Sequence, residues 1–291
     1  MKKKKFNGYT PFLIPYILLL VVFIVLPMIF IVTYSVLDKT SSLPIYTFKI
    51  ENYTQFFSSW IYMKCIGKSL YLALVSTIIC LLISYPIAYF ISKRKPETQG
   101  VLVLLITAPM WINMLLRTLA IKQVLDGPIL KLVQLFNPDI TILIGNDFSV
   151  ILGMVYNYIP YMLLPIYTIL SKIDHKLVEA STDLGGKSRH TFLHIIFPLS
   201  LSGVASGCTI TFLSSATTIT ITKYLGEGRY FLIGNLIETE FITNSRWGFG
   251  SAISLILLII IMIVMWGFNR IGYSEEESIW KALKQRFGLK Y

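Results

Sequence analysis

Long apolar stretches separated by short charged segments dominate the pattern of this chain. Six of them contain at least about 20 residues each, the length that an α-helix needs to cross a bilayer. They cover residues 11–37, 69–92, 101–121, 148–170, 195–222 and 249–269. None alternates polar with apolar residues, which excludes the strands of an outer-membrane barrel. The pattern therefore predicts an all-α polytopic membrane protein with six transmembrane helices.

These helices divide the chain into one membrane domain and two tails. We expect a basic cytoplasmic N-terminal tail at residues 1–10, a six-helix domain at 11–271 and a cytoplasmic C-terminal tail at 272–291. Each loop is shorter than the roughly 50 residues that an autonomous soluble domain needs. The pattern therefore leaves no room for an extramembrane catalytic domain.

Composition and charge support a membrane protein and add an orientation. Hydrophobic residues make up 55% of the chain and charged residues 14%, whereas soluble domains contain about 25% charged residues. The net charge is +11, and most of the 26 lysines and arginines fall on segments that are cytoplasmic if the N-terminus is inside. This asymmetry follows the positive-inside rule. It indicates a multi-pass protein of the cell membrane with both termini cytoplasmic, in contact with lipid and without a nucleic-acid partner.

Residues that could bind a metal or catalyse a reaction are few. The chain has three cysteines and three histidines, namely Cys65, Cys80, Cys208, His175, His190 and His194. Their spacing matches no metal-site pattern, so we expect no metal and no cofactor. The predicted spans contain no His, Asp, Glu or Lys. This argues against an intramembrane enzyme and against the charge-paired sites of secondary carriers.

The polar residues inside the spans are hydroxyls, amides and aromatics. The candidates for a substrate path are Trp111, Asn113, Tyr156, Asn157 and Thr218. For each of them, an interhelical hydrogen bond or an interfacial anchor is the alternative role.

Two glycines in the fifth stretch, Gly203 and Gly207, stand four residues apart among other small residues. This spacing lets helix backbones approach closely. The neighbour is either a helix of the same bundle or a helix of a second subunit.

A short outer helix is predicted after the third stretch. Asp126 and Pro128 match the cap and first turn of a helix, and Asn137 with Pro138 match its end. The apolar residues between them indicate a helix lying at the outer interface.

The cytoplasmic loop at residues 171–194 is the most informative segment. Ser171 and Asp174 match the start of a capped helix, and Gly185 matches its end. Small and apolar residues recur between them at helical spacing, and Ser188 is a candidate cap for the next helix. An exposed helix with such a stripe suits a groove on another protein, although packing on its own bundle is equally consistent.

The same loop contains a set of residues with a distinctive spacing. Glu179-Ala180-Ser181 is followed after three residues by Gly185 and after nine more by Ile195-Ile196-Phe197-Pro198. This spacing resembles the signature of ABC importer permeases. It departs from the family pattern only in Ser181 for alanine and Phe197 for leucine. In that family this loop forms a coupling helix that docks on a cytoplasmic ATPase. The resemblance implies that role for Glu179, Ala180, Ser181, Asp183, Leu184 and Gly185.

Further segments along the chain carry a more specific resemblance. They are Asn52-Tyr53-Thr54, Pro109-Met110-Trp111-Ile112-Asn113, Arg117-Thr118, residues 160–167, residues 232–235 and residues 247–252. These segments resemble the spermidine/putrescine permeases of this family. The resemblance implies a non-catalytic permease subunit of a type I, binding-protein-dependent importer for polyamines. Its implied partners are a second homologous permease, two copies of an ATPase subunit and an extracytoplasmic substrate-binding protein. The alternatives are an importer permease for another small solute and a stand-alone channel or secondary carrier.

Overall fold

A computed structural model describes residues 10–39, 46–48, 50–139 and 142–287. The described residues are mainly helical, which confirms the all-α fold class. They divide into two compact units, Met1–Met63 with Leu236–Ile259 and Lys64–Asn235 with Ile260–Tyr291. The predicted N-terminal tail at residues 1–10 lies almost entirely outside the described residues.

The first unit is built from an apolar N-terminal helix and the segments that pack against its end. Its elements are α1 (Thr10–Leu20), a π-helical turn η1 (Val21–Val25), α2 (Leu26–Val36), β1 (Leu37–Lys39), β2 (Tyr46–Phe48), α3 (Glu51–Ser58), the second half of α13 (Ile233–Glu238), a π-helical turn η5 (Thr239–Thr243) and the start of α14 (Trp247–Phe287). The strands pair antiparallel. Tyr53 donates a hydrogen bond to the Ser35 hydroxyl at 2.9 Å, and the rings of Phe56 and Tyr62 stack at 5.9 Å. The hydrogen bond joins α3 to the end of α2, and the ring stack joins α3 to the start of the next helix.

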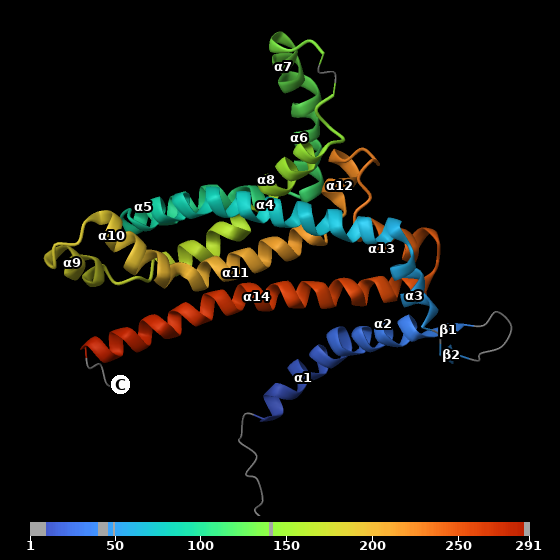
Figure 1. Cartoon of the computed structure of the whole chain (residues 1–291), viewed down its shortest axis with the longest axis horizontal. Coiled ribbons are helices and arrows are strands. Elements are labelled where there is room, and N and C mark those ends of the chain that lie inside the picture. Colours follow the sequence, from blue (N-terminus) through green and yellow to red (C-terminus); the bar gives the residue numbers. More distant parts are fainter. Residues whose placement is uncertain (1–9, 40–45, 49, 140–141, 288–291) are drawn as a thin grey trace, which may run out of the picture. The chain divides into compact units, whose positions relative to one another are not determined.

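The second unit contains the remaining helices. They are α4 (Trp60–Ser92), α5 (Pro96–Thr107), a 3-10 turn η2 (Ala108–Trp111), α6 (Met114–Val124), a π-helical turn η3 (Leu125–Ile129), α7 (Leu130–Phe136), α8 (Asp147–Leu170), α9 (His175–Asp183), α10 (Ser188–Thr191), a π-helical turn η4 (Phe192–Ile196), α11 (Phe197–Ala216), α12 (Thr220–Leu225) and the later part of α14. In this unit α4, α8 and α11 run side by side (Figure 1), with the α4 hydroxyl of Ser84 donating to the carbonyl of Ile159 on α8 at 3.3 Å.

The core of the second unit lies between α8 and α11, which pack backbone to backbone. A Cβ atom added to Gly203 would lie 2.9 Å from the carbonyl oxygen of Pro165, and one added to Gly207 would lie 2.9 Å from that of Met162. Met162 itself is fully buried. The glycine pair therefore packs against a helix of its own chain, which settles the two alternatives that the sequence left open.

The described residues contain helices long and apolar enough for six membrane crossings, if one bent pair is counted as a single crossing. Five continuous helices can span a membrane, and Pro96–Trp111 with Met114–Phe136 forms a pair bent by 91°. The third predicted stretch, 101–121, is therefore not one continuous helix. Ile112 is extended, and Asn113 caps α6 by accepting a hydrogen bond from the backbone N–H of Leu115 at 2.8 Å. Because Asn113 caps a new helix, the preceding helix does not continue into α6, and the chain turns here (Figure 1).

The boundaries of two other predicted segments also differ from the structure. Helix α4 begins at Trp60, nine residues before the predicted stretch, because Lys64 and Lys68 interrupt the apolar pattern without interrupting the helix. The separate outer helix starting at Asp126 is wrong as well. Helix α6 continues through η3, which contains Pro128, into α7, and only the predicted end at Asn137 agrees. At the C-terminal end, α14 is one helix that continues past residue 271 to Phe287.

Candidate functional site

The cytoplasmic loop predicted from residues 171–194 contains a short exposed helix, α9. It begins after Asp174, whose Oδ1 accepts a hydrogen bond from the Lys176 N–H at 3.0 Å. The predicted start at Ser171 is wrong, because Ser171 closes the end of α8 and its hydroxyl donates to the Thr168 carbonyl at 3.2 Å. The boundary differs by one turn because both residues are capping types and only the packed structure selects between them.

A tight turn joins α9 to α10. Gly185 has a φ of +78°, a left-handed conformation that side chains with a Cβ adopt at a cost. Gly186 follows with its N–H bonded to the Ser181 carbonyl at 2.9 Å, and a Cβ there would lie 2.6 Å from the same oxygen. Ser188 is the first residue of α10 and not its cap, since Lys187 occupies the cap position. The two glycines thus let the chain reverse within three residues.

Ser181 is the inward-facing member of the predicted coupling residues. Its hydroxyl lies 2.8 Å from the hydroxyl of Thr191 on α10, and the pair is buried. Glu179, Ala180, Asp183, Leu184 and Gly185 are exposed, with Leu184 at 86% exposure. One side of the loop therefore holds the buried hydroxyl pair of Ser181 and Thr191, which we call the clasp. The other side is an exposed surface that ends at the apolar side chain of Leu184.

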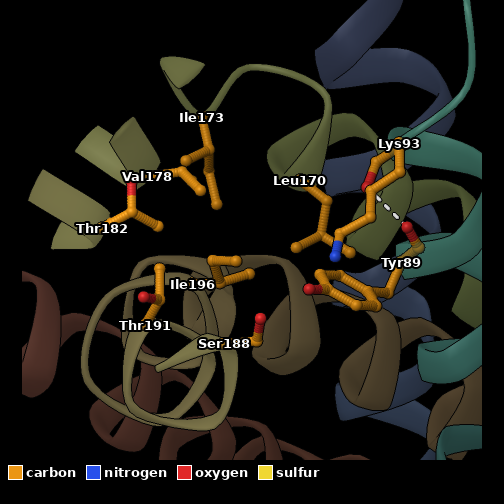
Figure 2. Close-up of a pocket in the computed structure, with 10 residues that line it drawn as sticks. Tyr89, Lys93, Leu170, Ile173, Val178, Thr182, Ser188, Thr191 and Ile196 are labelled. Atoms are coloured by element: carbon orange, nitrogen blue, oxygen red, sulfur yellow. Dashed lines mark hydrogen bonds between the residues drawn. The ribbon is translucent and has the colours of Figure 1, made fainter. Parts of the chain in front are cut away.

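Behind α9 lies a cavity of about 290 Å³ that the sequence reasoning missed (Figure 2). Its lining residues are Tyr89, Ser92, Lys93, Leu170, Ile173, Val178, Thr182, Ser188, Thr191 and Ile196. The Lys93 ammonium group lies 4.2 Å from the centre of the Tyr89 ring. Val178 and Thr182 stand one turn apart on α9 and therefore lie on the same face of the helix. This spacing is the one feature of the sequence that points to the face lining the cavity. The cavity lies between α9 and the ends of α4 and α8.

The five candidate path residues fall into two groups. Trp111, at 77% exposure, and Asn113 lie at the bend between α5 and α6, and Tyr156 is 47% exposed on α8. Asn157 and Thr218 are buried at 0% and 5% exposure. The amide nitrogen of Asn157 donates to the Gly153 carbonyl at 2.9 Å, while its oxygen has no partner among the described residues. Among the described residues, no hydrogen bond joins any two of these five side chains.

Arg117, which falls within the predicted span 101–121, is a further candidate that was not among the five path residues. The structure buries it on α6 at 7% exposure. Its Nε and Nη1 have no hydrogen-bond partner among the described residues. The signal available in the sequence was a single arginine in an otherwise uncharged stretch, which is unusual enough at membrane depth to indicate a role.

An ion-pair cluster fixes the N-terminal end of α8. Lys68 on α4 lies 2.6 Å from Oδ2 of Asp147, and Tyr230 donates a hydrogen bond to the other carboxylate oxygen. Burial, together with the hydrogen bond and negative charge of Asp147, raises the pKa of Tyr230 to about 12. Tyr230 therefore remains a protonated donor at neutral pH. The cluster ties the segment after α12 to the beginning of α8.

The sequence between residues 81 and 272 matches the family described as binding-protein-dependent transport system inner membrane component. The chain belongs to this family. Its matched region includes α9, the α8–α11 core and the bend at Asn113. It is a multi-pass membrane protein, as its helices long enough to span a bilayer also indicate.

Named relatives and solved structures agree with this family. The spermidine/putrescine transport system permease protein PotB of Haemophilus influenzae is 35% identical over 76% of this chain and 78% of its own length. The protein of the same name from Escherichia coli is 32% identical over 77% and 84%. A chain of a bacterial ABC transporter involved in alginate import matches with a TM-score of 0.74 at 13% identity, covering 91% of this chain and 94% of that one. A chain of the MetNI methionine ABC transporter matches with a TM-score of 0.57 at 15% identity, over 74% and 96%. At these identities the structures show the fold.

Among the described residues, no group of three or more His, Cys, Asp or Glu side chains could hold a metal ion. The rings of His190 and His194 stack at 4.1 Å, and Nδ1 of His194 lies 3.1 Å from the His190 carbonyl. The pair is exposed, and its described contacts lie within one turn of helix.

Proposed function

We propose that this family member is the transmembrane permease subunit of an ATP-driven importer for polyamines. The observation that carries the proposal is the similarity to spermidine/putrescine permeases over more than three quarters of the chain. In the proposed complex it pairs with a second homologous permease in the lipid bilayer. Two copies of a cytoplasmic ATPase subunit and an extracytoplasmic substrate-binding protein complete the importer, and both termini of the chain face the cytoplasm.

The proposed contact with the ATPase is the exposed side of α9. Leu184 offers an apolar side chain at 86% exposure, and exposed apolar residues of this kind suit a cleft in a partner. Glu179, Ala180 and Asp183 are exposed on the same short helix. We expect these residues to enter the ATPase cleft, while Gly185 permits the turn that follows.

Movement of α9 reaches the membrane through its clasp to α10. The Ser181–Thr191 hydroxyl contact at 2.8 Å joins the two helices, and α10 continues through η4 into α11. Because α11 packs on α8 without intervening side chains at Gly203 and Gly207, a displacement of α11 requires α8 to move or the interface to slide. The cavity behind α9 gives the loop room to shift before that force is transmitted. This is a two-state element whose equilibrium the ATPase can bias.

The proposed substrate path uses aromatic and amide groups because the described spans contain no buried carboxylate for a polycation to meet. An aromatic face attracts an ammonium group by about 0.5–2 kcal/mol, depending on desolvation. Trp111 and Tyr156 offer exposed rings, and Asn113 lies beside Trp111 at the bend. The buried pair Asn157 and Thr218 offers oxygen acceptors deeper in the bundle.

The test is uptake of labelled spermidine and putrescine by proteoliposomes containing the complete importer, energised by internal ATP. Gly185→Trp is the decisive variant, and we expect uptake to fall at least about tenfold because both the turn and the docking surface change. Gly228→Trp is the matched control. Gly228 also has a positive φ, +70°, with open space around its Cβ position, but lies outside the coupling loop.

Uptake lost in the Gly185 variant and kept in the Gly228 variant supports coupling through this loop. Normal uptake by Gly185→Trp at matched expression contradicts it. Substrate class is read separately in the same assay. ATP-dependent uptake of another solute, with no uptake of either polyamine, would overturn that part of the proposal.

A further inference from the structure

The cavity behind α9 contains hydrogen-bond donors that the described residues leave free. The Lys93 ammonium group lies 4.2 Å from the centre of the Tyr89 ring, and no carboxylate of the described residues forms an ion pair with it. The hydroxyls of Tyr89 and Ser188 likewise have no hydrogen-bond partner among the described residues. Figure 2 shows both hydroxyls facing the same space as the ammonium group. The cavity therefore offers one positive charge and two free hydroxyls to a ligand.

The other groups that line the cavity set the sign of the ligand's charge. Ser92 already donates to the Tyr89 carbonyl at 2.9 Å, and Thr182 to the Glu179 carbonyl at 2.7 Å. Among the described lining residues, Lys93 is the one charged side chain and no carboxylate is present. A cation with free hydroxyl donors beside it favours an anion, because an anion accepts hydrogen bonds and those bonds are stronger than the bonds between neutral partners.

A second hollow of about 390 Å³ adjoins the cavity and is mainly apolar. It shares Tyr89 and Ser188 with the cavity. Its other lining residues are Tyr85, Pro86, Arg189 and Phe192. A ligand whose charged group lies in the cavity can therefore extend an apolar part past Tyr89 into the second hollow. This combination suits an amphipathic anion better than a compact inorganic one.

Both spaces lie where membrane-spanning helices end. Of the helices long and apolar enough to cross a bilayer, α4 ends at Ser92, α8 ends at Leu170 and the helix that contains α11 begins at Ser188. Ends of spanning helices lie at the level of the lipid headgroups, and a lysine there extends its ammonium group toward them. In the orientation proposed above, this is the cytoplasmic leaflet. Basic pockets between helices on that side are suited to anionic headgroups.

We propose that these two spaces bind one anionic phospholipid of the phosphatidylglycerol class. Its phosphate lies in the cavity, where it accepts hydrogen bonds from Lys93, Tyr89 and Ser188, and the upper part of an acyl chain lies in the second hollow. The phosphate of this lipid is negatively charged at neutral pH and only accepts hydrogen bonds, which matches the free donors. The inference rests on the proposed orientation of the chain and not on the solute that the importer carries, and its test does not use polyamine.

The experiment measures thermal unfolding of the purified, delipidated importer complex in detergent, with phosphatidylglycerol or phosphatidylcholine of the same acyl chains added. For the unchanged complex we expect phosphatidylglycerol to raise Tm by about 3 °C when it is present at roughly ten times its Kd. Phosphatidylcholine should have little effect, because its choline group opposes Lys93. Native mass spectrometry of the same samples should show phosphatidylglycerol retained by the complex.

Two variants and a matched control place the lipid in the cavity. Lys93→Gln should raise the phosphatidylglycerol concentration that gives half of the Tm shift about tenfold, because it removes the charged donor. Lys95→Gln is the control, since it removes one positive charge two residues away from an exposed side chain that does not line the cavity. Its response should equal that of the unchanged complex. Ser188→Ala removes one neutral donor and should raise the same concentration about fivefold.

A soluble headgroup separates lipid from free phosphate as the source. Glycerophosphoglycerol, which has the headgroup without acyl chains, should give no shift at concentrations at which phosphatidylglycerol saturates. An equal shift from this soluble compound overturns the assignment to lipid. Equal shifts from phosphatidylglycerol and phosphatidylcholine, or equal responses of Lys93→Gln and Lys95→Gln, overturn the site itself. Polyamine uptake is measured independently, so failure of the proposed transport function remains distinguishable.

Discussion

The α9 loop and the α8–α11 interface use small residues for opposite purposes. In the interface, Gly203 and Gly207 are small because the α8 backbone occupies the space that a Cβ would need. In the loop, a Cβ on Gly185 would meet only open space. Glycine is favoured there because the backbone has a φ of +78°. A substitution in the interface therefore acts on folding, whereas one in the loop acts on whatever docks there. Gly203 and Gly207 therefore hold the bundle together, whereas Gly185 shapes a surface that is open to a partner.

The largest effect is expected at the interface. Gly207→Leu would place a side chain against the Met162 carbonyl, where the Cβ alone would lie at 2.9 Å. We expect the free energy of unfolding to fall by about 3 kcal/mol or more, because neither backbone can move away. Gly67→Leu on α4 is the control, since a Cβ there meets nothing within 4 Å. Folded yield and Tm after detergent extraction are the measurements, and equal stability of the two variants would contradict the assigned packing.

An intermediate effect is expected from the candidate path residues, and for the exposed Trp111 it concerns transport and not folding. Trp111→Ala removes an exposed ring, so stability should stay unchanged while the initial rate of polyamine uptake falls roughly fivefold, equivalent to about 1 kcal/mol. Trp111→Phe should restore most of the rate. Alanine at Asn113, Tyr156, Asn157 and Thr218 completes the series, scored at matched expression with ATPase activity measured alongside. Normal transport by all five alanine variants would place the path elsewhere.

The smallest effect is expected at the clasp between the two helices of the loop. Ser181→Ala removes the hydroxyl that lies 2.8 Å from Thr191 and should lower stability by about 1 kcal/mol, as for one lost hydrogen bond. If the clasp transmits force, ATP hydrolysed per molecule transported should rise. Ser181→Thr keeps a hydroxyl and serves as the control. An unchanged ratio in the alanine variant would separate the clasp from coupling.

Part of this protein could be read from its sequence because the underlying physics is local. A transmembrane helix needs only enough consecutive apolar residues, so the crossings were recognisable, apart from ends such as Trp60 where lysines interrupt the pattern. The loop signature depends on residue spacing along one segment, and the turn at Gly185, just after α9, depends on the conformational freedom of that glycine. These features need no knowledge of neighbours in space.

Other features were decided only by tertiary structure. Spacing indicated that Gly203 and Gly207 meet a backbone, but only packing identified α8 as that neighbour. Asn113 could have continued a helix or capped a new one, and the 91° bend depends on that choice. The burial of Arg117 and the cavity behind α9 follow from helix rotation and from where helix ends meet. Hydropathy along one chain does not encode these relations, because they are set by side chains distant in sequence that compete for the same space.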